Sequence, residues 1–282
     1  MLKVKIGGVP EHFNLPWYAA IENGLFANVG IDLQWTDYST GTGAMIKDLR
    51  SNVIDIAVLL TEGIVADIVN GNESKIVQWF VKSPLVWGIH APASSNFDIS
   101  EIKNKRFAIS RFGSGSHLMA CVMAEQNGFK IDESQFVIVN NMDGAIQAFK
   151  NGNADVFMWE KFMTKPLVDK NVFKRIGECP TPWSCFAIAV RTKFLNENRE
   201  EVKTILKIIN SITSQFKNKI DLPEIISASY NIQIDDAKEW LKSVQWSSDS
   251  KIEKSEIEFV METLLNINII QKKIEVEQIV IN

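Results

Sequence analysis

The amino-acid sequence predicts an α/β fold of two similar lobes, each a mixed, mostly parallel sheet flanked by helices. Residues 39–63 supply the first observation: a small-residue turn, a short helix and an apolar run that leads to Glu62. Because the apolar run at 54–60 hardly alternates, it is typical of a strand buried on both faces of a parallel sheet. Residues 147–162 repeat this order around Glu160, which indicates a duplicated architecture. Two such units would enclose a cleft between them.

Size and composition agree with two lobes. The chain has 282 residues, enough for two separate cores, and its 46% hydrophobic and 23% charged content is ordinary for a soluble globular protein. The net charge of −4, without a strongly basic region, argues against a nucleic-acid partner. The apolar runs are all shorter than the roughly 18 residues of a membrane span.

The cysteines and the N-terminus bear on location. Cys121, Cys179 and Cys185 are an odd number without metal-site or CxxC spacing. Cys179 and Cys185 flank a proline-rich segment and could approach one another, but a free-thiol reading favours a reducing compartment. A strand begins directly after Met1, without the features of a signal peptide. The expectation is a cytoplasmic protein, the alternative being a periplasmic one whose leader was trimmed.

The predicted elements follow in order along the chain. Proline in a first helical turn supports a helix from Pro16, and Gly24 ends it. Amphipathic spacing predicts a long helix at 197–217. Strands are expected at 2–9, 31–35, 54–60, 75–82, 107–110, 135–139, 154–159 and 185–190. Helices are expected at 16–23, after Gly43, and at 63–70, 117–127, 142–151, 197–217, 225–230, 234–245 and 254–267, with a short strand or helix in 274–281.

Several motifs together resemble a known family. They are WYAAIENGLFANVGIDLQW (residues 17–35), GTGAM (41–45), NVIDIAVLLTEG (52–63) and NGNADVFMWE (151–160). In combination they resemble the periplasmic-type substrate-binding proteins of the nitrate, sulfonate and taurine group, over roughly residues 3–190. That group also includes binders of thiamine-pyrimidine precursors and the related fungal pyrimidine synthases. The sequence lacks the cysteine-rich run of those synthases.

The resemblance implies the type 2 periplasmic-binding-protein fold, with two lobes joined by a two-segment hinge. Residues 1–88 and 189–282 would form lobe 1, and residues 89–188 lobe 2. The chain would cross between them near 84–91 and 185–191. The helices after residue 191 would pack back on lobe 1.

Two glycine-rich helix starts are candidate ligand contacts. Gly41, Thr42 and Gly43 precede one helix, and Ser114, Gly115 and Ser116 precede another. Helix N-termini present free N–H groups and the positive end of the helix dipole to a ligand. The alternative is that both are ordinary turns with Ser or Thr caps.

Glutamates and aromatic residues point to the ligand's chemistry. Glu62 and Glu160 are expected at the strand ends where open sheets bind ligands. Carboxylates suit an amine or an amino-substituted heterocycle, although each could instead form a salt bridge to Arg111 or Lys161. Aromatic walls would hold a planar ring, with Trp183, between two prolines, as the expected stacking residue. Trp35, Trp79 and Trp87 are assigned to core or hinge packing.

Histidines complete the predicted cleft. His12 and His117 would bond a ring nitrogen of the ligand, while His90 is assigned to the hinge. With three histidines and no clustered cysteines, no metal site is predicted. The predicted ligand-binding residues are His12, Phe13, Trp17, Gly41, Thr42, Gly43, Thr61, Glu62, Arg111, Ser114, Gly115, Ser116, His117, Trp159, Glu160 and Trp183.

The sequence thus predicts a binding protein, without catalytic residues or a cofactor, that closes two lobes over a planar nitrogen-containing ligand such as a thiamine-related aminopyrimidine. One alternative is an enzyme of pyrimidine metabolism that uses His12, His117 or a glutamate as acid or base. Another is the sulfonate- or nitrate-binding component of a transporter, with a permease partner if it is exported. Sequence patterns do not fix the oligomeric state.

Overall fold

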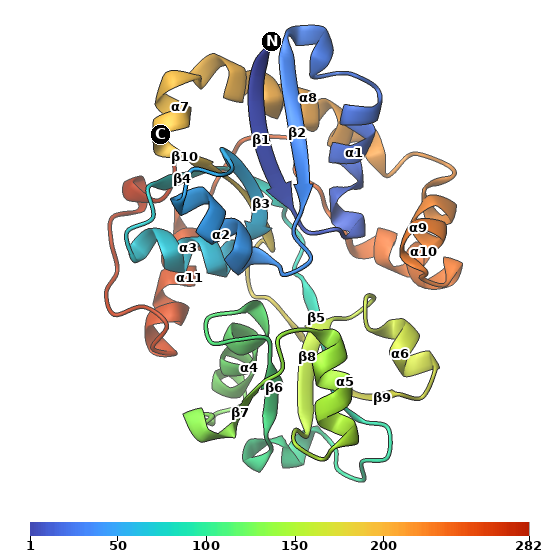
Figure 1. Cartoon of the computed structure of the whole chain (residues 1–282). Helices are drawn as coiled ribbons and strands as arrows, with labels where there is room; N and C mark the ends of the chain where they lie inside the picture. Colours follow the sequence, from blue (N-terminus) through green and yellow to red (C-terminus); the bar gives the residue numbers. More distant parts are fainter. Residues whose placement is uncertain (282) are drawn as a thin grey trace.

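The computed structural model describes residues 1–281 and shows two lobes, each built on a sheet (Figure 1). Within these residues both sheets have five strands, in the orders β2-β1-β3-β10-β4 and β7-β6-β8-β5-β9. The first sheet contains β1 (Leu2–Gly8), β2 (Ile31–Asp37), β3 (Ile56–Leu60), β4 (Ser74–Val81) and β10 (Phe186–Arg191). The second contains β5 (Val86–Pro92), β6 (Phe107–Ile109), β7 (Phe136–Ile138), β8 (Val156–Glu160) and β9 (Phe173–Pro180).

In each sheet of the described chain, one strand runs against the other four. β1 pairs in parallel with β2 and β3, whereas β10 is antiparallel to both of its neighbours, β3 and β4. In the second sheet β6 pairs in parallel with β7 and β8, whereas β5 is antiparallel to β8 and β9. The reversed strand is in both cases the one that has just arrived from the other lobe.

Helices cover both sheets (Figure 1). The first lobe has α1 (Leu15–Glu22), α2 (Thr42–Arg50) and α3 (Thr61–Val69), and the second has α4 (Gly115–Gln126), α5 (Met142–Lys150) and α6 (Lys165–Asp169). After β10 come α7 (Thr192–Glu197), α8 (Arg199–Phe216), α9 (Leu222–Tyr230), α10 (Ile234–Ser243) and α11 (Lys254–Asn266). Short 3₁₀ helices are η1 (His12–Asn14), η2 (Ala27–Val29), η3 (Ile99–Asn104), η4 (Glu133–Gln135) and η5 (Val276–Gln278). No helix in residues 1–281 is both long enough and apolar enough to span a membrane.

The C-terminal helices pack on the first lobe. The indole N–H of Trp246 donates to the backbone oxygen of Phe13 at 2.8 Å, and Val280 forms a bridge with Ile76 of β4. α8 buries one apolar side against the lobe, as its amphipathic spacing predicts. These contacts join residues more than 150 positions apart, which local patterns do not reveal.

Two short segments connect the lobes. β4 ends at Val81 and β5 begins at Val86, while β9 ends at Pro180 and β10 begins at Phe186. Residues 82–85 and 181–185 are therefore the crossings. They differ from the predicted ranges, 84–91 and 185–191, because strand pairing takes Val86–Pro92 into the second sheet and Phe186–Arg191 into the first.

The crossings are tied together and the lobes also touch beside them. Thr181 donates its backbone N–H to the carbonyl oxygen of Leu85 at 2.9 Å, and its Oγ1 accepts from the Leu85 N–H at 2.9 Å. Lys161 Nζ, just after β8, lies 3.3 Å from Glu239 Oε1 on α10. The structure therefore has its lobes in contact across the cleft.

Three predicted elements differ from the structure. α3 begins at Thr61, so Glu62 lies in the first turn of a helix instead of at a free strand end. The helix expected at 197–217 is present as α8, Arg199–Phe216, but the short helix α7, Thr192–Glu197, which precedes it, was not expected. The strand β9 was not expected, because residues 173–180 carry charged side chains that mask the apolar alternation of an edge strand.

Gly144, in the first turn of α5, has no room for a side chain. A Cβ there would lie 1.8 Å from the carbonyl oxygen of Val139, a backbone atom held by the strand–helix connection. We predict that Gly144→Ala lowers the free energy of unfolding by about 1–3 kcal/mol, measured by denaturant titration. Gly177→Ala is the matched control, since its nearest neighbour would be a flexible atom, Ile99 Cδ1, at 3.1 Å. Equal losses in the two variants would contradict the steric assignment.

Candidate functional site

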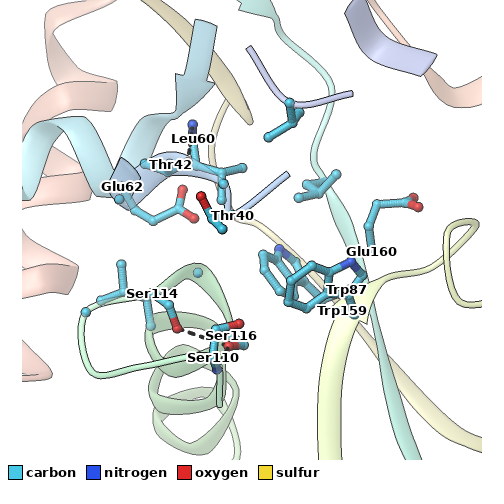
Figure 2. Close-up of a pocket in the computed structure, with 18 of the residues that line it drawn as sticks. Thr40, Thr42, Leu60, Glu62, Trp87, Ser110, Ser114, Ser116, Trp159 and Glu160 are labelled. Atoms are coloured by element: carbon cyan, nitrogen blue, oxygen red, sulfur yellow. Dashed lines mark hydrogen bonds between the residues drawn. The ribbon is translucent and has the colours of Figure 1, made fainter. Parts of the chain in front are cut away.

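A cleft lies between the two lobes at the carboxyl ends of their strands (Figure 2). The empty space inside it is ≈ 680 Å³ when the part open to solvent is counted. The lining residues are Val9, Glu11, Thr40, Gly41, Thr42, Gly43, Leu60, Glu62, Gly63, Leu85, Trp87, Ser110, Arg111, Gly113, Ser114, Gly115, Ser116, Leu118, Trp159, Glu160 and Phe186. They come from both lobes and from a crossing, so closure would bring them together around a ligand.

Three helices begin at this cleft. Gly41 caps α2 with φ 78° and ψ −164°, a conformation that residues with a side chain rarely adopt. Ser114 caps α4, and its Oγ accepts from the His117 N–H at 3.4 Å. Glu62 lies in the first turn of α3. The positive ends of three helix dipoles therefore face the same space.

The hydroxyl groups at these helix starts mainly hold their own loops. Thr42 Oγ1 accepts from the Leu60 N–H at 3.2 Å. Ser116 Oγ accepts from the Ser110 N–H at 3.0 Å and lies 3.1 Å from Ser114 Oγ, as Figure 2 shows. The predicted helix-start residues thus line the cleft and also serve as the caps of the alternative interpretation.

Glu62 presents a free carboxyl oxygen to the cleft. The side chain is fully buried, and its Oε2 accepts from the indole N–H of Trp183 at 2.9 Å. Its Oε1 has no hydrogen-bond partner among residues 1–281, and Figure 2 shows the carboxyl group directed into the cavity beside Thr40. A buried acceptor without a partner costs free energy, so a donor on a ligand would be favourable here.

Glu160 is arranged differently from its counterpart. Its Oε2 accepts from the backbone N–H groups of Phe162 at 2.8 Å and Met163 at 2.6 Å, so it caps the loop that follows β8. In Figure 2 its carboxyl group points away from Glu62 and past the tryptophans. Lys161, the alternative salt-bridge partner, pairs instead with Glu178 at 3.1 Å. The two glutamates therefore line one cleft without forming an equivalent pair.

Trp87 and Trp159 form the aromatic wall of the cleft. They lie side by side on neighbouring strands β5 and β8 (Figure 2), with ring centroids 6.4 Å apart at 71°. Trp159 also stacks on Phe157 at 5.5 Å and 20°, which fixes its ring. A planar ligand would find an apolar surface here, completed by Leu60 and Leu85.

Arg111 brings a positive charge into the cleft from the second lobe. Its guanidinium lies against Gly43 at the start of α2: a Cβ on Gly43 would be 1.6 Å from Nη2. This position puts a cation at the positive end of a helix dipole, which is unfavourable unless an anionic group is nearby. The cleft therefore combines one acceptor-rich side, at Glu62, with one donor-rich side, at Arg111.

Six of the predicted residues do not line the cleft: His12, Phe13, Trp17, Thr61, His117 and Trp183. Trp17 is core, packed against Phe26, Trp35 and Phe80.

His12 is fully buried beside Phe13 and Trp240, with ring centroids 4.8 and 4.1 Å away. Burial lowers the pKa of His12 to about 3, so the ring is neutral.

The other three, Thr61, His117 and Trp183, lie behind the cleft wall. Thr61 Oγ1 donates to the Ser184 oxygen at 2.5 Å. His117 Nδ1 accepts from the Gly113 N–H at 3.1 Å, so the neutral ring carries its proton on Nε2 and secures the loop before α4. Trp183, the expected stacking residue, is only 3% exposed and holds Glu62. Its ring lies edge-on to Phe259 of α11, with centroids 6.4 Å apart, a contact that the flanking prolines do not indicate.

Sequence reasoning missed several lining residues. The sequence assigns Trp87 to core or hinge packing, and its position in the cleft becomes clear only once β5 is known to pair with β8. Glu11 adds another carboxyl group from the loop after β1. The sequence could have indicated Glu11, because it follows the end of a parallel strand, as Glu62 and Glu160 do.

The cleft is rich in carboxyl groups with raised pKa values. Burial raises the pKa of Glu62 to about 7, and the bonds it accepts oppose the rise. Burial, followed by the negative charge of Glu11, raises the pKa of Glu160 to about 8. Burial also raises the pKa of Glu11 to about 7. Near neutral pH these groups can change between donor and acceptor.

Neither metal-ligand clusters nor disulfides occur in the described chain. Within residues 1–281, no group of three or more His, Cys, Asp or Glu side chains is placed to hold a metal ion. Cys121, Cys179 and Cys185 are free thiols, and burial raises the pKa of Cys179 to about 12. Low reactivity follows for Cys179, because the thiolate is the reactive form.

The buried carboxyl of Glu160 predicts a pH-dependent stability. Burial holds its folded pKa at about 8, above its ordinary value of 4.5, so the stabilising protonated form is lost as pH rises through the folded pKa. We predict that the thermal midpoint falls between about pH 7 and 8.5, and falls less steeply in Glu160→Gln, measured by calorimetry.

Glu258→Gln, on the exposed face of α11, should keep the slope of the wild-type protein. Measurements that start at pH 7 exclude a contribution from the titration of His12 and His90, because burial lowers the pKa of each to about 3. An unchanged slope in Glu160→Gln would show that another group causes the pH dependence.

Comparisons with known proteins identify the fold. Residues 87–179 match the family model described as Ca3427-like PBP. The solved structure of the Candida albicans CA3427 gene product, reported to define a family with the generic periplasmic binding protein fold, superposes with a TM-score of 0.90. The two proteins are 29% identical, and the match covers 98% of this chain and 93% of that one.

Bacterial binding proteins are more distant. The alkanesulfonate-binding protein SsuA from Xanthomonas axonopodis pv. citri, bound to MOPS, superposes with a TM-score of 0.81 at 13% identity, covering 98% of this chain and 96% of that one. A putative aliphatic sulfonates-binding protein of Bacillus subtilis (strain 168) is 23% identical over 213 residues, 73% of this chain. The match spans 63% of that protein's length.

This chain has the periplasmic-binding-protein fold. The predicted two-lobed α/β architecture and the resemblance to periplasmic-type substrate-binding proteins are confirmed.

Proposed function

Starting from the periplasmic-binding-protein fold, we propose that this chain captures a small, planar, nitrogen-containing molecule by closing its two lobes over it. An aminopyrimidine related to thiamine precursors is the ligand that we put forward. Closure would pivot on the crossings at 82–85 and 181–185, which the strand ends delimit.

The observation that carries the proposal is the free carboxyl oxygen of Glu62. Its Oε1 is buried in the cleft wall without a partner in the described chain. An exocyclic amino group on a ring would donate to this oxygen. When Glu62 is protonated, the same carboxyl could instead donate to a ring nitrogen, so one side chain serves both edges of an aminopyrimidine.

The aromatic wall supports a flat ligand. A ring lying against Trp87 or Trp159 gains about 0.5–1.5 kcal/mol beyond its area burial. Leu60, Leu85 and Phe186 complete an apolar surface around it. Nitrate or a short sulfonate would leave this surface without a matching partner.

A sulfonate or nitrate ligand is the second candidate, and a specific observation favours it. Arg111 and the starts of α2 and α4 all line the cleft, and helix N-termini bind anions. Two of the similar proteins are described as sulfonate-binding. Against it stand Glu11, Glu62 and Glu160, whose ionised forms would repel an anion.

A ligand panel with two variants separates the candidates. We predict that 4-aminopyrimidines raise the thermal midpoint by several degrees at about 100 times their dissociation constant. Glu62→Gln should weaken this binding about tenfold or more. The substitution replaces one carboxyl oxygen, an acceptor, by an amide NH2 group, and the resulting side chain cannot ionise. Arg111→Met should change it little.

The opposite pattern would favour the second candidate. Stabilisation by alkanesulfonates or nitrate, lost in Arg111→Met and kept in Glu62→Gln, would contradict the aminopyrimidine proposal. Glu258→Gln, away from the cleft, is the control for nonspecific effects of losing a carboxylate.

Two expectations remain predictions from the sequence. One is a cytoplasmic location, and the other is a permease partner if the protein is instead exported.

A further inference from the structure

Trp183 connects the cleft to the hinge. It lies in the crossing between β9 and β10, and its indole N–H donates to Glu62 Oε2 at 2.9 Å. The ring is 3% exposed, packs edge-on toward Phe259 of α11 at 6.4 Å, and does not line the cleft. Trp183 therefore acts on a ligand only through Glu62.

The backbone around Trp183 is fixed on both sides. The Thr61 N–H donates to the Cys185 oxygen at 3.1 Å, and Thr61 Oγ1 donates to the Ser184 oxygen at 2.5 Å. Thr181 Oγ1 donates to the oxygen of Trp183 itself at 3.0 Å. Residues 184–185 are thus held by the first turn of α3, which also carries Glu62.

The Trp183 bond decides which oxygen of Glu62 is free. A carboxyl group has two acceptor oxygens, and the indole N–H occupies Oε2, leaving Oε1 in the cleft. Without this donor the group could rotate, or remain protonated to a higher pH, because a donor to the charged form favours that form.

We propose that Trp183 is a positioning residue whose indole N–H holds Glu62 with Oε1 toward the ligand, and that its place in the crossing links this orientation to the hinge. This inference rests on the proposed function for the ligand's contact with Glu62, but the Trp183–Glu62 bond itself can be tested without a ligand.

Other ionisable groups surround Glu62. Glu11, Arg111 and Glu160 line the same cleft from the β1–η1 loop, the β6–α4 loop and the end of β8. Cys185 lies at the end of the crossing. Burial, followed by the negative charge of Glu62, raises the pKa of its thiol. The test must therefore assign any titration to Glu62 by substitution.

The ligand-free test follows the indole ¹H–¹⁵N resonance of Trp183 with pH, the signal being assigned by its loss in Trp183→Phe. We expect it to shift as Glu62 ionises, to lose that shift in Glu62→Gln, and to keep it in Glu160→Gln. A titration that persists in Glu62→Gln would overturn the inference.

The binding test uses 4-aminopyrimidine as the probe. Trp183→Phe keeps an aromatic ring but removes the donor, so we expect affinity to fall about tenfold at neutral pH. Losing the donor should keep Glu62 protonated to a higher pH. The rise in affinity that accompanies the ionisation of Glu62 should therefore occur at a higher pH than in the wild-type protein. A loss that is the same at every pH would indicate a purely structural role and contradict the proposal.

Trp79→Phe is the matched control. Trp79 is 2% exposed in β4, its indole N–H has no partner among residues 1–281, and it does not line the cleft. Removing its N–H should leave the pH profile of binding unchanged. If 4-aminopyrimidine does not bind the wild-type protein, the proposed ligand is wrong, while the ligand-free titration still decides the role of Trp183.

Discussion

The exchange of one strand between the lobes is the constraint on which the rest of this structure depends. β10 lies between β3 and β4, and β5 lies between β8 and β9, each antiparallel to both neighbours. Interior strands have no free edge, so neither can leave its sheet without breaking two ladders of hydrogen bonds. Relative motion of the lobes is thereby confined to the crossings, and the strand ends that carry the cleft residues keep their places within each lobe.

The duplication of the lobes did not produce two equivalent binding halves. Glu62 and Glu160 occupy corresponding places, yet one offers an oxygen to the cavity and the other caps its own loop. The difference arises from their neighbours: the Glu62 carboxyl meets a tryptophan of the crossing, whereas that of Glu160 meets free N–H groups within three residues. Recognition by Glu62 is consequently placed beside the hinge, where a ligand contact and a change of lobe angle can affect one another.

Much of the fold could be predicted because local sequence patterns specify its helices, strands and turns. The unbroken apolar run of β3 and the glycine-rich turn before α2 are each contained in a few consecutive residues, and the same is true of their counterparts in the second lobe. The site was harder to predict, since it depends on pairings between distant segments. Trp87 reaches the cleft because β5 pairs with β8, and Trp183 lies edge-on to Phe259 of α11. His12 is enclosed by Trp240 of α10, more than two hundred residues away in the chain.

Gly115 has a consequence for the resting shape of the protein. A Cβ at this position would come within 3.0 Å of Leu60 in the opposite lobe and within 2.9 Å of Trp87. A side chain at this position would press on Leu60 of the other lobe and on Trp87 of its own lobe, so a large residue here would tend to separate the lobes. How closely the lobes approach thus depends in part on the size of residue 115, which itself lines the cleft. Related chains could thus differ in how closely their lobes approach through the size of this one residue.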